Sequence, residues 1–388
     1  MINKQRIREE FVAFVGVTAE TRAEREAADL LKQRLAGLQA DVREDNAGEK
    51  IDGNCGNVLA YIKGNRPDAP VLMLSAHLDC VAPCAGIKPR FKDGLITSGG
   101  DTVLGSDDKA GVVAILEAIR VLREQKLPHG DLQLVFTVAE EGGLHGAKSL
   151  ERESLKADLG YVLDAEGPPG EVVTITPGQD SIHVIMHGKT AHAGMAPEEG
   201  LNAIVLAGKA LAQLQQGRID EETTANVGLI SGGIATNIVP DKVEISCEAR
   251  SRNPEKLARQ TRRMAETFQR VAAAYGGKAE VDIKRVYDSF TLDAASPVVQ
   301  LAQKAAEDIG LPSRLTSTGG GSDANLFNTC GIPCAVLGIG MSKVHTVDEF
   351  IKEKDLYDIA GWVVAIIRRA ARLEKAQAAA RPTTVHSY

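Results

Sequence analysis

The sequence predicts an α/β protein, in which a large domain with a mostly parallel sheet is interrupted by a smaller α+β domain. Near both ends of the chain, short apolar runs alternate with helical periodicity, which is typical of a parallel sheet covered by helices. The middle of the chain alternates apolar and polar residues along its strands, which indicates a sheet with one covered face. The first pattern then returns, so we expect the large domain to be discontinuous.

The first half of the chain contains strand-like runs and two helical patterns. The predicted strands are residues 57–63, 71–76, 132–138 and 161–163. The run at 132–138 is almost continuously apolar, as expected for a strand that is buried on both faces. Residues 106–125 predict a helix for which Ser106 is the N-cap, and residues 1–14 predict an amphipathic helix.

The middle of the chain predicts the order strand, helix, strand, strand, helix, strand, which matches a ferredoxin-like unit. These elements are expected at residues 181–187, 199–215, 225–230, 242–250, 254–275 and 278–286. After them come a predicted helix at 297–309, a strand at 334–338 and a last helix at 356–376. We therefore place the large domain at residues 1–176 and 291–388 and the inserted domain at 177–290. The tail after residue 379 is expected to be loose.

The composition excludes several classes of protein. Of the 388 residues, 44% are hydrophobic and 25% are charged, as in globular rather than disordered chains. The formal net charge of −7 gives no general attraction to nucleic acid, and no apolar stretch is long enough to span a membrane. Six cysteines are too few for a disulfide scaffold and no signal-peptide pattern is present, so a cytoplasmic location is expected.

Acidic side chains and imidazoles follow the predicted strands of the large domain. They are His77 and Asp79 after the strand at 71–76, Glu140 and Glu141 after 132–138, Asp164 after 161–163, His345 after 334–338, and Asp107 at the start of the helix at 106–125. Ligands of open α/β sheets bind at the carboxyl ends of the strands, so these side chains are expected to meet. Carboxylates that meet without a cation repel one another strongly, and the pattern therefore predicts a metal site.

The ligand types and their charges limit the metal. Imidazoles among carboxylates suit zinc, cobalt or manganese better than calcium or magnesium. Asp107, Glu141 and Asp164 with one bridging hydroxide would balance two divalent cations, which is the composition of a two-metal hydrolytic centre.

Two further acids have separate expected roles. Asp79 lies two residues beyond His77 on an extended chain, so it can accept the distal N–H of that imidazole and orient it. Of the adjacent Glu140 and Glu141, only one can face the metals, and the other is free to act as a general base.

These motifs occur in the order found in the dizinc metallopeptidases that include peptidase T, aminoacylase and bacterial glutamate carboxypeptidase, and the chain resembles that family over nearly its whole length. The matching segments are His77-Leu78-Asp79, Asp107-Asp108-Lys109-Ala110-Gly111, Glu140-Glu141 and His345. The resemblance implies one zinc held by His77 and Asp164, a second held by Glu141 and His345, Asp107 as the bridge and Glu140 as the general base.

The resemblance also implies a substrate class. Asp at position 164 is typical of the aminopeptidase-type members, so we expect hydrolysis of the N-terminal peptide bond of short peptides, as in a tripeptidase, by a metal-bridging water that Glu140 activates. In the family the inserted domain acts as a lid and a dimerisation domain, which implies a homodimer. His192 resembles the lid histidine that stabilises the oxyanion. The substrate-binding positions implied are Asn237, Arg250 and the loop residues Gly320, Gly321 and Ser322.

Several alternatives remain open at the level of the sequence. Peptidase T carries Arg where this chain has Gly319, which puts strict tripeptide specificity in question. An N-acyl amino acid deacylase or a carboxypeptidase would use the same metals, and a non-catalytic metal-binding protein would have no need of Glu140. Without the resemblance, His192 is a turn histidine, and Asp108 and Lys109 cap or pair on a helix surface. The pairs Cys80/Cys84 and Cys330/Cys334 are more readily explained as buried thiols than as a zinc site.

Overall fold

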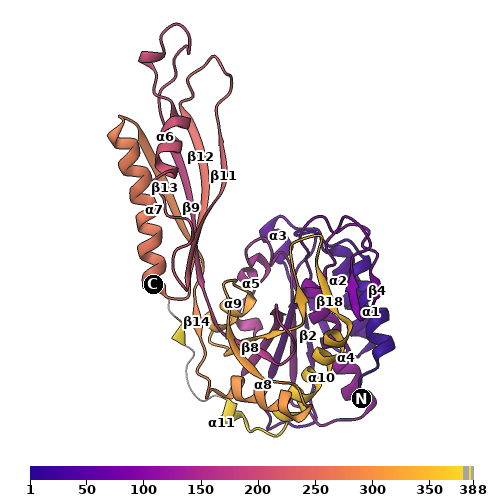
Figure 1. Cartoon of the computed structure of the whole chain (residues 1–388). Helices are drawn as coiled ribbons and strands as arrows, with labels where there is room; N and C mark the ends of the chain where they lie inside the picture. Colours follow the sequence, from indigo (N-terminus) through magenta and orange to yellow (C-terminus); the bar gives the residue numbers. More distant parts are fainter. Residues whose placement is uncertain (379–383, 386–388) are drawn as a thin grey trace. The chain divides into compact units, whose positions relative to one another are not determined.

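The computed structural model describes residues 1–378 and 384–385, and its contacts divide them into two compact units (Figure 1). Unit 1 comprises Met1–Thr174, Thr291–Ser317 and the described residues between Ser322 and Thr384. Unit 2 comprises Ile175–Phe290, Thr318–Gly321 and Val385. No helix among the described residues is both long and apolar enough to cross a membrane.

Unit 1 is built on a ten-stranded sheet with the order β1-β2-β6-β3-β7-β16-β8-β14-β19, in which β15 pairs with β8. The strands are β1 (Asp41–Glu44), β2 (Val58–Ile62), β3 (Leu72–His77), β6 (Leu132–Thr137), β7 (Leu159–Ala165), β8 (Glu171–Thr176), β14 (Phe290–Thr291), β15 (Arg314–Ser317), β16 (Cys334–Gly338) and β19 (Thr384–Val385). The central strands β6, β3, β7 and β16 are parallel, and β1, β2 and β8 pair antiparallel to their neighbours. The predicted α/β class with a mostly parallel sheet is therefore confirmed.

Helices accompany this sheet and bury their apolar faces. They are α1 (Lys4–Gly16), α2 (Arg25–Gly37), α3 (Ala47–Ile51), α4 (Ser106–Glu124), α5 (His145–Ser149), α8 (Pro297–Asp308), α9 (Asp323–Thr329), α10 (Glu353–Ala370) and α11 (Lys375–Ala378), with a 3-10 turn at Arg152–Ser154. The central α4 contacts α1, α10, β3 and β7, and its side chains are buried from Ser106 to Ile119. Trp362 of α10 is fully buried and its indole N–H donates to the carbonyl of Ala302 in α8 (3.0 Å), so these helices pack as one layer.

A small antiparallel sheet in unit 1 has the order β17-β18-β5-β4. Its strands are β4 (Arg90–Lys92), β5 (Leu95–Thr97), β17 (Met341–Ser342) and β18 (Phe350–Lys352). Ser342 pairs with Phe350, so residues 343–349 form the turn of a β-hairpin. We call this segment the 343–349 turn, and it carries His345.

Unit 2 contains one antiparallel sheet with the order β10-β11-β12-β9-β13. Its elements are β9 (Gly178–His187), a 3-10 turn (Pro197–Glu199), α6 (Ala203–Leu211), β10 (Gly217–Arg218), β11 (Thr223–Gly232), β12 (Lys242–Ser251), α7 (Pro254–Ala274) and β13 (Lys278–Tyr287). Alternate side chains of β9, such as Ile182, Val184 and Met186, are fully buried in a core shared with α6 and α7. The strand–helix–strand–strand–helix–strand order and the antiparallel pairing are those of a ferredoxin-like unit.

Two predicted helix boundaries are wrong. The helix predicted at 199–215 begins only at Ala203, because the Asn202 side chain accepts from the N–H of Val205 and caps it, and the helix ends at Leu211. The last helix begins at Glu353 rather than at residue 356 and ends at Ala370, before a separate short α11. The tail predicted to be loose lies outside the described residues, apart from the pair in β19.

Candidate metal centre

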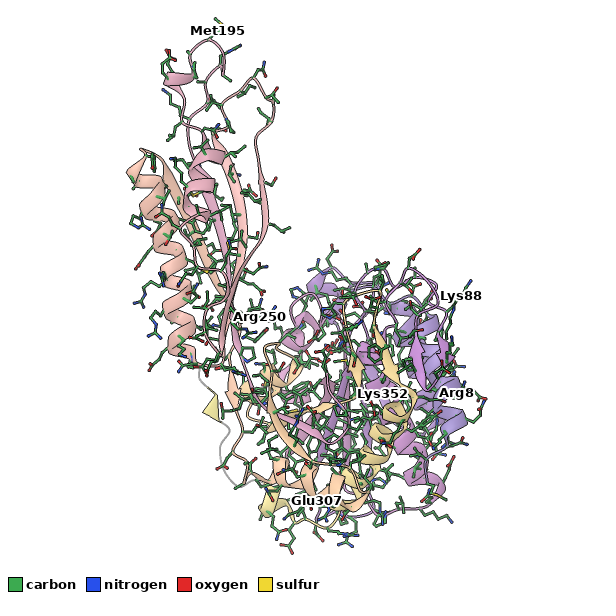
Figure 2. All side chains as sticks on the ribbon, viewed as in Figure 1. Arg8, Lys88, Met195, Arg250, Glu307 and Lys352 are labelled. Atoms are coloured by element: carbon green, nitrogen blue, oxygen red, sulfur yellow. The ribbon has the colours of Figure 1, made fainter. Side chains whose placement is uncertain are left out.

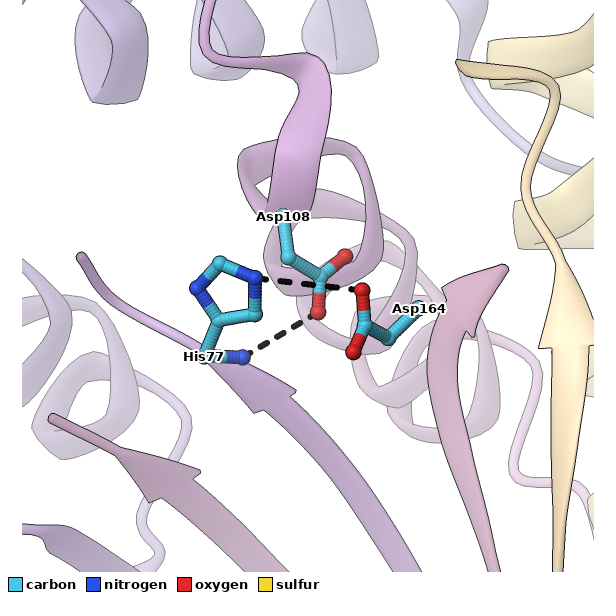
Figure 3. A group of neighbouring side chains, drawn as sticks. All are labelled: His77, Asp108 and Asp164. Carbon is cyan, nitrogen blue, oxygen red and sulfur yellow. Dashed lines mark hydrogen bonds and ion pairs between the residues drawn. The ribbon is translucent and has the colours of Figure 1, made fainter. Parts of the chain in front are cut away.

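His77 is the last residue of β3 and lies between two carboxylates. Its Nε2 is 2.9 Å from Asp107 Oδ1 and 3.8 Å from Asp164 Oδ1 (Figure 3 shows the Asp164 contact). Asp164 belongs to the neighbouring parallel strand β7, and Asp107 opens α4. The strand ends therefore bring these side chains together as the sequence predicts, and the His77 side chain is only 2% exposed.

His345 approaches the same carboxylate from the opposite side. Its Nε2 is 3.3 Å from Asp107 Oδ2 and 2.9 Å from Glu141 Oε2. Asp107 thus directs one oxygen at His77 and the other at His345. The His345 side chain is 51% exposed, so this half of the cluster is open to solvent.

Asp79 connects His77 to the glutamate pair. Its carboxylate lies 3.3 Å from His77 Nδ1 and accepts from Thr21 Oγ1 (2.8 Å). The same carboxylate accepts from the backbone N–H groups of Glu140 (2.9 Å) and Glu141 (3.1 Å). Asp79 is therefore placed both to orient the imidazole and to fix the turn that carries the two glutamates.

Burial and mutual repulsion perturb the acids of the cluster. Burial, followed by the charges of Glu140 and Asp107, raises the pKa of Asp164 well above its usual value. Burial likewise raises the pKa of Glu140, and nearby Asp323 and Glu141 raise it further. Burial opposes ionisation of Asp107 too, but its hydrogen bonds to His345 and His77 outweigh this and hold its pKa low.

The imidazoles respond in the opposite direction. The hydrogen bonds to Asp107 and Glu141 raise the pKa of His345 to about 10. Burial lowers the pKa of His77, but Asp107 and Asp79 overcome it, so the net shift is upward. The raised pKa values mean that the cluster takes up protons to reduce the repulsion among its carboxylates. Divalent cations bound at the same place would reduce that repulsion instead.

The donor set fits such cations. One potential ligand atom from each of His77, Asp107 and Glu141 lies within 4.8 Å of the others, and the same holds for His77, Asp108 and Asp164. Mixed imidazole and carboxylate donors suit zinc, cobalt or manganese. No cysteine belongs to these groups, and all six cysteines are free thiols. Cys80, Cys84 and Cys334 are buried as expected, whereas Cys330 is only half-buried.

The expectation that Asp108 and Lys109 lie on a helix surface is wrong. Asp108 is fully buried, and its carboxylate accepts from the backbone N–H of His77 (3.1 Å, Figure 3) and of Gly111 (3.2 Å). Lys109 is also buried, and its ammonium donates to the carbonyls of Leu78 and Asp79. The two residues therefore fasten the end of β3 to the start of α4.

In unit 2, His192 lies in the exposed loop between β9 and α6. Its Nδ1 accepts from the backbone N–H groups of Gly194 and Met195 (both 3.1 Å), so a neutral ring carries its proton on Nε2. The carbonyl of Asn237 accepts from the N–H of Ala193 (3.0 Å), which brings the predicted Asn237 beside this loop.

Arg250 lies at the other end of β12 from this loop (Figure 2). Its Nε and Nη2 each donate to the carboxylate of Glu248 at 3.0 Å, so the guanidinium is already engaged within the strand. Unit 2 therefore brings His192 and Asn237 together, and places Arg250 apart from them.

The predicted glycine loop has a defined conformation. The N–H of Gly320 donates to Thr318 Oγ1 (3.1 Å), and the N–H of Ser322 donates to Asn325 Oδ1 (3.0 Å) in the capping box of α9. A Cβ on Gly321 would lie 2.2 Å from the ring of Tyr287, so any larger residue there would have to displace that ring. The backbone N–H groups of Gly320 and Ser322 are thus occupied by the side chains of Thr318 and Asn325.

Sequence reasoning missed two buried acids of unit 1. Asp323 opens α9, and its Oδ2 accepts from Thr137 Oγ1 (2.5 Å). Glu349 ends the 343–349 turn and accepts hydrogen bonds from the segment that leads to Asp107. Asp323 directly follows the glycine loop, which was a usable signal, whereas nothing near Glu349 in the sequence points to a partner more than 240 residues away.

Known proteins resemble this chain along almost its whole length. The family model of peptidase family M20/M25/M40 matches residues 73–369. A crystal structure of aminopeptidase PepT from Bacillus cereus ATCC 10987 is 43% identical with a TM-score of 0.86, and the match covers 95% of this chain and 99% of that one. A tripeptidase structure from Staphylococcus aureus subsp. aureus mu50 is 42% identical with a TM-score of 0.91, covering 96% and 100%. Peptidase T of Escherichia coli K12 is 25% identical over 356 residues, 82% of this chain and 86% of that protein.

The segment that matches the family model contains the whole cluster from His77 to His345 and most of the central sheet. The family match covers more than half of the chain. It includes the parallel strands, the converging histidines and the buried carboxylates. This chain belongs to peptidase family M20/M25/M40 and is a metallopeptidase.

Proposed function

We propose that this chain is a two-metal exopeptidase that hydrolyses the N-terminal peptide bond of short peptides. The aminopeptidase and the tripeptidase that are 42–43% identical to it support this substrate class. The observation that carries the two-metal part is the position of Asp107, whose two carboxylate oxygens each face a different histidine. A bridging carboxylate requires this arrangement.

We assign the ligands accordingly. His77 and Asp164 would hold one ion, Glu141 and His345 would hold the other, and Asp107 would bridge them. When bound, two such ions supply a water that ionises near neutral pH and polarise the scissile carbonyl. Zinc is the proposed metal, with cobalt and manganese as alternatives that suit the same donors.

Glu140 is the proposed general base. It does not belong to the ligand groups above, it is buried, and two hydrogen bonds from its turn to Asp79 fix its backbone. Its carboxylate would take a proton from the attacking water. Glu140 would then pass this proton to the leaving amine, and one group would serve both proton transfers.

Unit 2 is the proposed lid. Because Nδ1 of His192 is occupied by backbone donors, its Nε2–H is available to donate to an oxyanion, and Asn237 beside it would contact the substrate. Arg250 would bind a peptide carboxylate by exchanging Glu248 for it. Of the glycine loop, the Gly320–Ser322 segment would approach the substrate backbone.

A substrate panel tests the proposal. Metal-free protein is reloaded with zinc, cobalt or manganese and assayed on dipeptides, tripeptides, amino-terminally acetylated tripeptides and N-acetyl amino acids. We expect release of the first residue only from peptides with a free amine. Hydrolysis of N-acetyl amino acids would indicate a deacylase, and release of the last residue would indicate a carboxypeptidase. Two bound ions without any turnover would indicate a non-catalytic metal-binding protein.

We also propose a homodimer through unit 2. β11 is an edge strand that β10 covers only at Thr224 and Ala225. Beyond them, Leu229 and Ile230 are 72% and 53% exposed, and Ile234 in the following turn is 86% exposed. An unpaired edge with exposed apolar side chains favours a second copy as its partner. Leu229→Lys should convert the dimer to a monomer in light scattering, whereas Ile283→Lys on β13 should not.

The proposed location is the cytoplasm, which six free thiols and the absence of a membrane-spanning helix among the described residues support.

A further inference from the structure

Glu349 is a buried acid whose carboxylate binds four donors of one short segment. Its Oε2 accepts from the N–H groups of Leu104 (2.8 Å) and Gly105 (2.9 Å). Its Oε1 accepts from Ser106 Oγ (2.5 Å) and from the N–H of Asp107 (3.2 Å). The side chain of Glu349 is 2% exposed, so all of these bonds are shielded from water. We call residues 104–107 the Asp107 segment.

The other end of Glu349 belongs to the 343–349 turn, which carries His345. Within this turn Lys343 and His345 have φ angles of 54° and 62°, a left-handed conformation that is uncommon for residues other than glycine. The turn's own hydrogen bonds are local, for example from Thr346 Oγ1 to the carbonyl of Lys343 and from the N–H of Glu349 to the carbonyl of Thr346. Such a conformation persists only where the surrounding contacts hold it.

We propose that Glu349 is a positioning residue that fastens the 343–349 turn to the Asp107 segment and thereby sets the separation of His345 from Asp107. This inference rests on the two-metal assignment proposed above. The ion between His345 and Glu141 would depend on Glu349, because His345 reaches the cluster only from this turn. The ion at His77 and Asp164 would depend on it less, because those two ligands stand on adjacent strands of the central sheet and only the bridging Asp107 belongs to the segment that Glu349 binds.

The chemistry of the contact requires a carboxylate. All four partners donate, so the group that binds them must accept on both oxygens. A glutamine of the same shape would turn an NH₂ group toward backbone N–H donors that cannot reorient.

Zinc titration of the metal-free protein, followed by calorimetry, tests the proposal. In Glu349→Gln we expect the second zinc to bind about 10- to 100-fold more weakly, as for other residues that orient a ligand, and the first zinc to change less than about threefold. Ser106→Ala removes one of the four donors and should weaken the second zinc by a smaller factor. Glu353→Gln is the matched control: this glutamate pairs with Arg8 (3.2 Å) and does not touch the Asp107 segment.

A metal-free readout separates this inference from the two-metal proposal. Hydrogen exchange of the metal-free protein should rise in both the Asp107 segment and the 343–349 turn of Glu349→Gln, and in neither segment of Glu353→Gln. If the wild-type protein binds fewer than two zinc ions, the two-metal assignment is overturned. The exchange result would still test whether Glu349 holds the turn, because it is measured without metal. The positioning role is overturned if exchange in the turn is unchanged, or if both zinc ions weaken equally. If Glu349→Gln does not fold, Ser106→Ala decides between the same outcomes.

Discussion

The two histidines of the cluster are held in opposite ways. His77 ends a strand in the middle of the central sheet and is 2% exposed, whereas His345 stands in a hairpin turn and is 51% exposed. Backbone pairing with Thr137 of β6 fixes the first, and side-chain contacts fix the turn that carries the second. The site therefore has a buried half that the sheet determines and an open half that depends on a few polar bonds.

The adjacent glutamates divide along the same line. Glu141 contacts His345 in the open half, and Glu140 is buried on the side of Asp164 and Asp323. Neighbouring residues of one chemical type can thus serve separate tasks, because the turn directs their side chains to different environments.

The largest expected effect is at Glu140. Glu140→Gln should lower kcat by about 100- to 10,000-fold, the usual contribution of a positioned base, while the protein keeps both zinc ions. The matched Glu141→Gln should instead lose zinc from the open half. Turnover of a tripeptide and zinc content after dialysis measure the two. A Glu140→Gln variant that keeps near-normal turnover would exclude this residue as the base.

The next effect compares the histidines themselves in the metal-free protein. His77→Ala removes the imidazole that lies between the buried Asp79 and Asp107 and should cost about 3–5 kcal/mol of unfolding free energy. His345→Ala removes a half-exposed side chain and should cost less than about 1 kcal/mol. Urea unfolding of both variants measures this. Equal losses would mean that the two halves do not differ in how they support the fold.

The smallest effect is a pH dependence in the buried half. Burial raises the pKa of Asp323 to about 6, although the hydrogen bond from Thr137 acts in the opposite direction. Since the folded state then binds this proton more tightly than the unfolded state, the stabilisation is complete below about pH 4 and is lost as the pH rises through about 6. Between pH 4 and 7 the metal-free wild type should therefore lose up to about 3 kcal/mol of unfolding free energy through this group. Asp323→Asn cannot titrate, so the variant should not show this loss. Urea unfolding at several pH values measures this. The same change of unfolding free energy with pH in both proteins would contradict the prediction.

Much of the fold follows from sequence patterns, and the fold class is confirmed. The strand at 132–138 and the period-two strands of unit 2 were readable because a buried strand leaves a periodic signal over several residues. The start of α6 was misplaced because its cap, Asn202, competes with an earlier 3-10 turn at Pro197–Glu199. Boundaries of this kind depend on single side-chain bonds rather than on periodicity.

The site divides in the same way. Residues at strand ends, such as His77 and Asp164, could be expected to meet because parallel strands end at one edge of a sheet. The burial of Asp108 and Lys109 could not be expected, since it depends on the loop after β3 lying against the start of α4. Glu349 was hidden for a stronger reason: its donors lie more than 240 residues away and carry no local pattern.

The ends of the inserted segment have a consequence for how such a chain can arise. The chain leaves unit 1 after Thr174 and returns at Thr291, and the N–H of Leu292 donates to the carbonyl of Thr174 (2.8 Å). The points where the chain leaves and re-enters unit 1 are thus hydrogen-bonded neighbours. A tight turn could span the distance between them. In evolutionary terms, a stretch of coding sequence at this point can be gained, exchanged or deleted without altering the order of the strands around it.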